Sequence, residues 1–361
     1  MDHPDDGTRL DVSDIQRRFA EFSDAFGYLP LYSRLARGLS HDAEAASLLL
    51  AAQPGQERPV LLFAALHDLV LRRPDLPVAP WYATVVGRDA VATSDPWPAA
   101  RLTLLDHADE VRRLIGSHTT QTNEVNRSTF AAAITALAAS DLPGVPVTLL
   151  ELGASAGLLL NVDRYRVEYV GGPVLGDPLS PVRCGGRLAG PLTAELPVIA
   201  ARYGLDRHPV PADDDEALRW LKACLWPDVP GRAERFEAGV RLLRRNPPDL
   251  ITGDFVEDLP HVLGELVDAH PTHHVVVFTS WALTYVARAD RPAIPEALAQ
   301  AATRVPVTWW TAEPHGAMPG LAAPPTDDTV LGVQRWRDAM TTGPVAVGTS
   351  HPHGDWVHLR R

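Results

Sequence analysis

The chain of 361 residues contains little cysteine and little lysine, and each shortage excludes classes of protein. Cys184 and Cys224 are too few and too far apart for a disulfide framework or a cysteine-based zinc site. Lys222 is the single lysine, and the formal net charge is −12. Because bulk binding of nucleic acid needs a basic surface to neutralise phosphates, the composition argues against a nucleic-acid partner.

Long apolar runs are missing as well. No stretch approaches the roughly 18 uninterrupted apolar residues of a membrane span. The first residues, MDHPDDGTRLDVSD, are too acidic and polar for a signal peptide. These absences predict a cytoplasmic protein without a membrane partner. With 45% hydrophobic and 22% charged residues, the chain has the composition of a globular protein and the length for a large α/β domain plus an appended one.

The hydrophobic pattern changes character near residue 140. Before it, apolar residues recur at three- and four-residue steps, as between Ile15 and Phe19, which is typical of helices. After it, buried apolar strands alternate with helices, which indicates a parallel sheet, and the last segment predicts a hairpin. We expect an N-terminal helical domain over 1–140. Over 141–361 we expect an α/β domain with a doubly wound, mostly parallel sheet and an antiparallel C-terminal edge.

The segment VTLLELGASAGLLLN, residues 147–161, is the most informative part of the chain. It predicts an apolar strand, a turn of small residues and the start of a helix, with Glu151, Gly153, Ser155 and Gly157 at alternate positions. Small residues allow a ligand to approach the backbone, and a helix start offers unpaired N–H groups. The Gly-x-Gly-x-x-Gly spacing of a dinucleotide site is absent. A tight structural turn remains the alternative.

This acid-x-Gly-x-Ser-x-Gly pattern resembles the first motif of class I S-adenosylmethionine-dependent methyltransferases. The resemblance implies a methyltransferase-like, Rossmann-like fold in which the turn wraps the methionine part of S-adenosylmethionine. Acids at later strand ends would supply further contacts. Asp206, or the nearer Asp163, would bind the ribose hydroxyls, and Asp254 with Phe255 would contact adenine. Each acid also suits a simple helix cap.

Polar residues flank the predicted strand on both sides. Because one set precedes the strand and the other follows it, both are expected to face one cavity at its carboxyl end. The predicted substrate-binding residues are Gln121, Asn123, Arg127, Asn161, Arg164 and Trp281. The arginines suit a carboxylate, phosphate or sulfate on a small-molecule substrate. A solvated helix start is the alternative for residues 117–128.

Three residues are predicted to move protons: Glu124, Asp163 and His353. His353 belongs to HPHGDW, residues 351–356, a histidine-rich segment close to the C-terminus. The segment lacks the His-Glu-x-x-His register of a helical zinc site, and no cysteine supports it, so no metal is predicted. A turn between edge strands is the structural alternative for this segment.

Several stretches together resemble the largely actinobacterial domain-of-unknown-function family 2332. They are LLFAALHDLVL (61–71), TQTNEVNRS (120–128), ELGASAGLLLNVDRY (151–165), LRWLKACLWPD (218–228), VVVFTSWALTYV (275–286) and HPHGDW (351–356). The resemblance implies the methyltransferase-like fold and no particular activity. Asn126, Leu159 and Trp281 stand where the family commonly has glycine, asparagine and a smaller residue. These departures suggest either a specialised substrate or a cofactor site no longer used for methyl transfer.

Three functions fit these observations. The first is a small-molecule methyltransferase of bacterial specialised metabolism. The second is a non-methylating enzyme on the same fold that performs elimination or ring closure. There Arg127 or Arg164 would hold an anionic leaving group, and Asp163 or Glu124 would take the proton. The third is a non-catalytic binding protein. The sequence leaves a protein partner and a homo-oligomer open.

Overall fold

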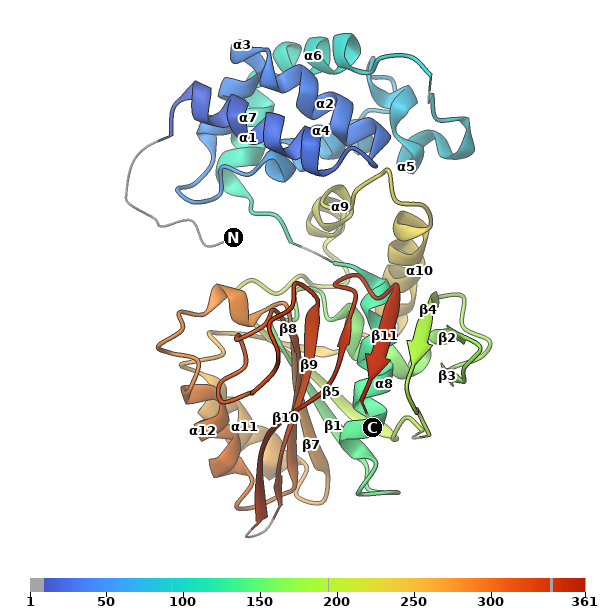
Figure 1. Cartoon of the computed structure of the whole chain (residues 1–361), viewed down its shortest axis with the longest axis vertical. Coiled ribbons are helices and arrows are strands. Elements are labelled where there is room, and N and C mark those ends of the chain that lie inside the picture. The colour runs from blue at the N-terminus through green and yellow to red at the C-terminus, as the bar shows by residue number, and fades with distance from the viewer. Residues whose placement is uncertain (1–9, 92, 122, 194, 338–339, 361) are drawn as a thin grey trace. The chain divides into compact units, whose positions relative to one another are not determined.

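The computed structural model describes residues 10–91, 93–121, 123–193, 195–337 and 340–360 (Figure 1). Contacts divide the chain into two compact units. Unit 1 comprises residues 1–123 and 215–234, and unit 2 comprises residues 124–214 and 235–361. In the described residues no helix is long and apolar enough to cross a membrane.

Unit 1 is helical in its described residues, as the three- and four-residue apolar spacing predicts. Its α-helices are α1 (Val12–Ala25), α2 (Pro30–Ser40), α3 (Ala43–Ala46), α4 (Pro59–Arg72), α5 (Ala83–Val86), α6 (Trp97–Asp106), α7 (Ala108–Ser117) and α9 (Asp215–Ala223). Rings from three helices pack in its core, with Tyr32 and Phe63 centred 4.6 Å apart. Asp228 satisfies the start of α2, because its carboxylate accepts hydrogen bonds from the backbone N–H groups of Leu31 and Tyr32.

Unit 2 is built on one mixed, mostly parallel sheet. Its strands are β1 (Val147–Leu152), β2 (Arg166–Val170), β3 (Val174–Gly176), β4 (Arg183–Ala189), β5 (Ile199–Asp206), β6 (Asp249–Thr252), β7 (His274–Ser280), β8 (Val307–Glu313), β9 (Thr329–Arg337), β10 (Met340–Ser350) and β11 (Trp356–Leu359). Across the described residues their order is β3-β2-β4-β11-β10-β9-β8-β7-β1-β5-β6.

Five neighbouring strands, β6-β5-β1-β7-β8, form a parallel, doubly wound half of the sheet. The chain moves outward from β1 through β5 to β6, and then returns to the other side of β1 with β7 and β8. Leu152 therefore pairs with Leu205 on one side and with Thr279 on the other. This reversal makes the carboxyl ends of β1 and β7 the switch point, where ligands bind in such sheets.

The antiparallel strands of the sheet do not form its edge, as the sequence predicts that they would. Strands β8 to β11 run antiparallel in succession, as the closing hairpin predicts, but they lie inside the sheet. Residues 166–189 form β2, β3 and β4 beyond them, because β4 pairs in parallel with β11. The segment between the glycine turn and Asp206 therefore supplies the far edge of the sheet.

Helices cover both faces of the sheet of unit 2 (Figure 1). On one face lies α8 (Ser128–Ala139), an alanine-rich helix buried along nearly its whole length. On the other lie α11 (Leu259–Ala269) and α12 (Ala293–Ala301), whose apolar residues pack with β1, β7 and β8. Two further helical segments, η4 (Val125–Arg127) and η5 (Leu158–Arg164), flank β1 in sequence, and α10 (Arg232–Arg245) brings the chain back into unit 2.

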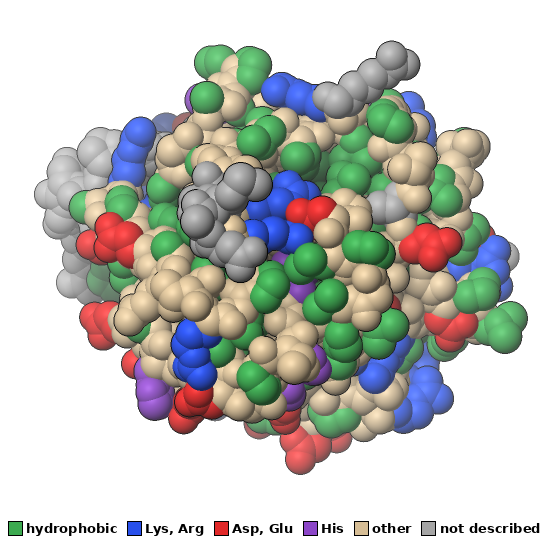
Figure 2. All heavy atoms as spheres, turned by 90° about the horizontal axis from the view of Figure 1, so that it is seen from below, with side chains coloured by type: hydrophobic (Ala, Val, Ile, Leu, Met, Phe, Trp, Pro, Cys, Tyr) green, Lys and Arg blue, Asp and Glu red, His purple; other side chains and the backbone are tan. Residues whose placement is uncertain are grey.

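Charged side chains of both signs are interspersed with apolar ones on the face of the molecule in Figure 2. Among the described residues drawn there, no extended surface carries a single sign of charge. The regions with distinctive chemistry in unit 2 are instead buried groups at the strand ends and a groove on the sheet.

Candidate functional site

The glycine turn after β1 has the left-handed backbone that its small residues permit. Gly153, Ser155 and Gly157 have φ values of +80°, +51° and +71°. A Cβ atom on Gly153 would lie 2.8 Å from the Cβ of Ala282, and one on Gly157 would lie 2.7 Å from Pro248 Cγ. Both glycines are therefore required by the packing of the protein itself, whatever ligand approaches the turn.

Asp206 ends β5 directly beside this turn. Its Oδ2 accepts a hydrogen bond from the backbone N–H of Ser155 at 2.8 Å, and its Oδ1 accepts one from His208 at 2.8 Å. Fifty residues separate Ser155 from Asp206 in the sequence, and β2 to β4, which they include, lie at the far edge of the sheet. The two residues are neighbours because β5 pairs in parallel with β1. Asp206 thus lies at the carboxyl end of the strand next to β1, in contact with the glycine turn.

The other two residues predicted at the adenine differ in their surroundings. Phe255 lies beside the turn, with its Cε1 3.7 Å from the position of a Cβ on Gly153. Asp254 uses Oδ1 to accept the backbone N–H of Val256 at 2.7 Å, and its Oδ2 pairs with Arg207. Asp254 therefore stabilises the backbone turn that follows it and forms a solvent-accessible ion pair with Arg207.

A buried arginine lies at the switch point. Arg127, only 5% exposed, donates from Nε to the carbonyl of Pro352 at 3.1 Å and from Nη1 to the carbonyl of Ser280 at 3.3 Å. Its positive charge also acts on two buried carboxyl groups, those of Glu151 and Glu313. We call these three side chains the Arg127 cluster.

Glu151 is the buried acid of the glycine-turn motif. Its side chain is on β1, and Oε2 has no hydrogen-bond partner among the described residues. Burial raises the pKa of this carboxyl well above its usual range, the negative charge of Asp206 raises it further, and Arg127 opposes both. Glu151 is therefore a buried carboxyl group whose surroundings favour its protonated form.

Glu313, at the end of β8, holds the loop that follows β7. Its Oε1 accepts hydrogen bonds from the backbone N–H groups of Ala282 at 2.9 Å and Leu283 at 3.2 Å. A hydrogen bond with the side chain of Thr279, on β7, also acts on this carboxyl group. Burial raises the pKa of Glu313 to about 7, while these hydrogen bonds and Arg127 act in the opposite direction.

Trp281, in the same loop, has a strained backbone. Its φ of +59° is rare for a large side chain, and conformations of this kind cluster at functional sites. The indole Nε1 donates to Thr329 Oγ1 at 3.0 Å, which fixes the ring toward β9. The hydrogen bonds of Glu313 and Thr329 thus hold the Trp281 loop in place. Trp281 is two residues after Thr279, where the pairing of β7 with β1 ends, so it lies at the switch point.

The residues after the turn form a separate network on η5. Asn161 is fully buried and donates to the carbonyl of Asn246 at 3.3 Å, while its Oδ1 accepts from Arg164 Nη1 at 3.3 Å. Asp163 pairs with Arg202 at 2.5 Å. The three-residue spacing of Asn161 and Arg164 brings them into contact, but no described contact joins this network to the Arg127 cluster.

The residues before the strand divide between the two units. Gln121 and Asn123 belong to unit 1, so a cavity shared with the residues of unit 2 stays a prediction. Glu124 is buried in unit 2, where Oε1 accepts the backbone N–H of Asn126 at 2.9 Å and approaches Arg235 Nη2 at 3.6 Å. It therefore stabilises the start of η4.

Asn126 joins distant segments of unit 2. Its Nδ2 donates to the carbonyls of Gly185 and His353, and its Oδ1 accepts the backbone N–H of Gly185 at 2.9 Å. The segment HPHGDW forms the turn between β10 and β11, and His353 contributes its backbone carbonyl to this contact. Asn126 thus has a structural role. In the described residues no three potential ligands are grouped as for a metal ion.

The sequence missed Glu313 and the partners of Arg127. A polar residue ending the buried run VPVTWWTAE is the signal that marks Glu313, by the same strand-end argument that selects Asp206 and Asp254. The carbonyls of Ser280 and Pro352 carry no such signal, because any residue type supplies a backbone carbonyl.

Comparison with known proteins gives a family. A search of curated proteins finds no match to the chain. The model of a family described as an uncharacterized protein conserved in bacteria, DUF2332, matches residues 14–358. Because this match spans nearly the whole sequence, the chain belongs to the DUF2332 family.

Proposed function

We propose that the chain is an S-adenosylmethionine-dependent methyltransferase that acts on a small molecule of bacterial specialised metabolism. The observation that carries this proposal is the glycine turn at the switch point, with the Asp206 carboxylate bonded to the backbone of Ser155. A turn of small residues with an acid at the end of the adjacent strand is the arrangement that binds a nucleoside in doubly wound sheets.

The residues at the turn suit an adenosyl ligand. Each oxygen of Asp206 accepts one backbone N–H and retains a lone pair for a ribose hydroxyl. Phe255 offers an aromatic side chain beside the turn for the adenine ring. The side of Gly153 that faces Ala282 is closed, so the ligand would contact the rest of the turn. When bound, S-adenosylmethionine supplies an electrophilic methyl group.

The Arg127 cluster supplies the chemistry of the chain itself. Arg127 can orient an anionic group of the substrate by charge-assisted hydrogen bonds. Glu313, with a pKa of about 7, is suited to accept a proton from a nucleophile near neutral pH. Burial of the cluster excludes water, which strengthens each of these interactions.

The same cluster favours a second function, elimination or ring closure without a methyl donor. A carboxyl group with a raised pKa can accept the proton, while the guanidinium of Arg127 stabilises an anionic leaving group. This chemistry does not need the glycine turn to bind a cofactor. Binding of S-adenosylmethionine therefore discriminates the two functions.

We expect isothermal titration of the full chain with S-adenosylmethionine to give saturable binding, and Asp206→Asn to weaken it about 10- to 100-fold, because charged hydrogen bonds contribute about 1.5–3 kcal/mol. Asp177→Asn is the matched control. Asp177 accepts a backbone N–H two residues ahead at 2.9 Å, as Asp206 does, but beside β3.

Two results would contradict this prediction. If the folded wild type gives no heat with S-adenosylmethionine at about 1 mM, methyl transfer is rejected and the second function is retained. If Asp206→Asn and Asp177→Asn lose affinity equally, Asp206 acts only through the turn that it stabilises. Melting temperatures of both variants separate loss of binding from loss of folding.

A further inference from the structure

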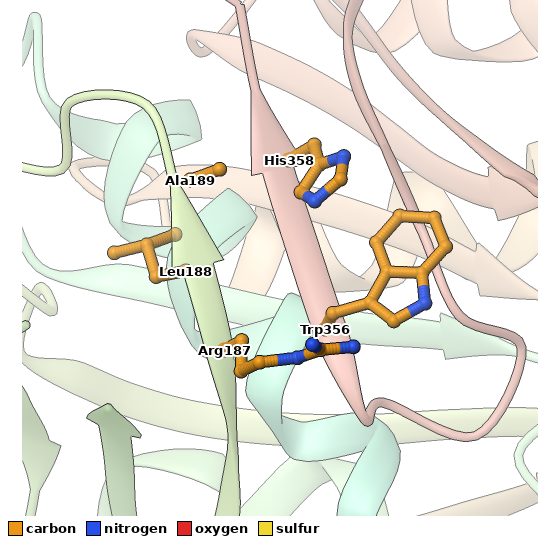
Figure 3. A pocket seen from close by; sticks show the side chains of 5 residues that line it. All are labelled: Arg187, Leu188, Ala189, Trp356 and His358. Carbon is orange, nitrogen blue, oxygen red and sulfur yellow. The ribbon is translucent and has the colours of Figure 1, made fainter. Parts of the chain in front are cut away.

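A groove lies on the solvent-facing side of the paired strands β4 and β11, apart from the Arg127 cluster. Cys184 on β4 and Val357 on β11 are buried on the α8 side of the sheet. The alternate residues therefore point to the opposite side, where they are exposed or half-buried. The groove has a volume of about 370 Å³ and is lined by Arg187, Leu188, Ala189, Trp356 and His358 (Figure 3).

The groove combines two neighbouring rings, tilted against each other, with a cation. Trp356 and His358 are two residues apart on β11, and their ring centroids are 4.5 Å apart at 34°. Trp356 pairs with Arg187 in the register of the two strands, so their side chains share one face. Figure 3 shows the guanidinium of Arg187 extending from β4 toward β11 below the indole. Among the described residues the guanidinium makes no hydrogen bond or ion pair.

The backbone beneath the groove is held firmly. The carbonyl of Asp355 accepts the backbone N–H of Arg187 at 3.0 Å, which joins the turn to β4. Gly354 packs so closely that a Cβ there would lie 2.1 Å from the carbonyl oxygen of Asn126, and its own carbonyl accepts from Thr129 Oγ1 at 2.8 Å. The rings and the guanidinium are thus presented by a preorganised support, which reduces the entropy cost of binding.

We propose that this groove binds a small aromatic carboxylate. The flat indole and imidazole offer aromatic surfaces on which a planar ring can stack. The guanidinium of Arg187 offers parallel N–H donors that match a carboxylate. Arg187 is the one arginine that lines the groove, and the whole chain has a net charge of −12, which repels anions. The groove therefore favours a ligand with one negative charge over a phosphate dianion.

The alternative is a solvated strand face with no ligand. A half-exposed tryptophan is common on protein surfaces, and a lone arginine beside it is not unusual. The distinguishing feature is the concave site that rings and a cation line together, because ligand sites combine apolar walls with a few placed polar groups. The proposed site is independent of methyl transfer.

The test uses 2-naphthoate as the probe, with the full chain, by calorimetry and by ligand-observed NMR. We expect saturable binding with a dissociation constant of about 0.1–1 mM, equivalent to about 4–5.5 kcal/mol. Arg187→Gln should weaken binding at least about fivefold, and Trp356→Leu should remove it. Trp356→Phe should retain most of it because an aromatic surface remains.

Arg183→Gln is the matched control. Arg183 is exposed on β4 four residues before Arg187, so it lies on the same face and its replacement removes the same charge. This variant should bind 2-naphthoate like the wild type. Cyclohexanecarboxylate, which has the anion without the ring, and naphthalene-2-carboxamide, which has the ring without the charge, should both bind at least about fivefold more weakly.

Three outcomes would overturn the proposal. The first is no binding of 2-naphthoate by the wild type at about 5 mM. The second is binding that Arg187→Gln and Trp356→Leu leave unchanged, since the ligand would then lie elsewhere. The third is equal binding of cyclohexanecarboxylate, which would show attraction to charge alone. Both substituted side chains are solvent-accessible, so melting temperatures near that of the wild type are expected and verify that each variant is folded.

Discussion

Replacement of Arg127 by methionine is expected to lower the free energy of unfolding by about 3–5 kcal/mol at pH 8. Methionine fills a similar length but removes the charge that opposes the burial of Glu151 and Glu313. It also removes the donors to the carbonyls of Ser280 and Pro352. The buried carboxylate of Glu313, ionised at pH 8, would then lack the positive charge that now acts on it.

The pH dependence of this loss identifies its cause. Glu313, with a pKa of about 7, takes up a proton as the pH falls, so the penalty of Arg127→Met should decrease between pH 8 and pH 6. Urea denaturation over this range measures it. In the double variant Arg127→Met with Glu313→Gln, the Glu313 charge is absent, and part of the lost stability should return.

Arg202→Met serves as the control for loss of a mostly buried arginine. Arg202 donates to the carbonyl of Leu160 and pairs with Asp163, and none of its described contacts involve Glu151 or Glu313. Its loss should be about as large at pH 6 as at pH 8. Equal pH dependence in the two variants would mean that Arg127 stabilises the fold without controlling the two carboxyl groups.

Local patterns predicted the centre of the sheet well. The run from Val147 to Leu152 is buried at every residue and forms the strand between β5 and β7, as an apolar run followed by small residues indicates. The parallel strands after it follow from their alternation with helices. These predictions succeed because a strand that is buried on both faces has a nearly continuous run of apolar residues in its sequence.

The far edge of the sheet and the Arg127 cluster could not be predicted in the same way. Strand β4 carries Gly185 and Gly186 and alternates between exposed and buried residues, so its apolar signal is weak. The cluster combines residues more than 180 positions apart in the sequence, from η4, β1 and β8. Only the order of strands shows that these positions meet, and that order is a property of the tertiary structure.

Asn126 illustrates the same limit. Its departure from the family pattern suggests a change in a ligand pocket, yet the side chain binds backbone groups of β4 and of the turn between β10 and β11. A buried amide with three such bonds is fully explained by the structure. Departures from a family pattern therefore need a contact in the structure before they can be assigned to substrate choice.

Glu313→Gln is expected to remove a pH-dependent loss of stability from the wild type. The pKa of Glu313 is about 7 in the folded protein, against 4.5 for a free side chain. Between these values the folded state binds more protons than the unfolded state, so wild-type stability falls as the pH rises through this window. The ionised carboxylate costs about 3 kcal/mol by pH 8.

The amide of glutamine stays neutral and keeps an oxygen for the N–H groups of Ala282 and Leu283. The variant should therefore resemble the wild type at pH 5 and exceed its stability at pH 8 by up to about 3 kcal/mol. Glu313→Ala, the control, loses the acceptor and should be less stable than Glu313→Gln at both pH values by about 1–3 kcal/mol. Curves of unfolding free energy against pH, from pH 5 to pH 9, measure all three proteins.

If Glu313 accepts the proton in the reaction, Glu313→Gln should also lower turnover by about 10²- to 10⁴-fold. The stabilised variant would then be the less active one, a combination that a purely structural residue does not give, because its loss lowers stability and activity together. Parallel pH curves for the wild type and Glu313→Gln would show that Glu313 does not ionise in this window. Full activity of a stabilised Glu313→Gln would assign proton transfer to another group, and Glu151, the other carboxyl group on which Arg127 acts, would be the next to replace.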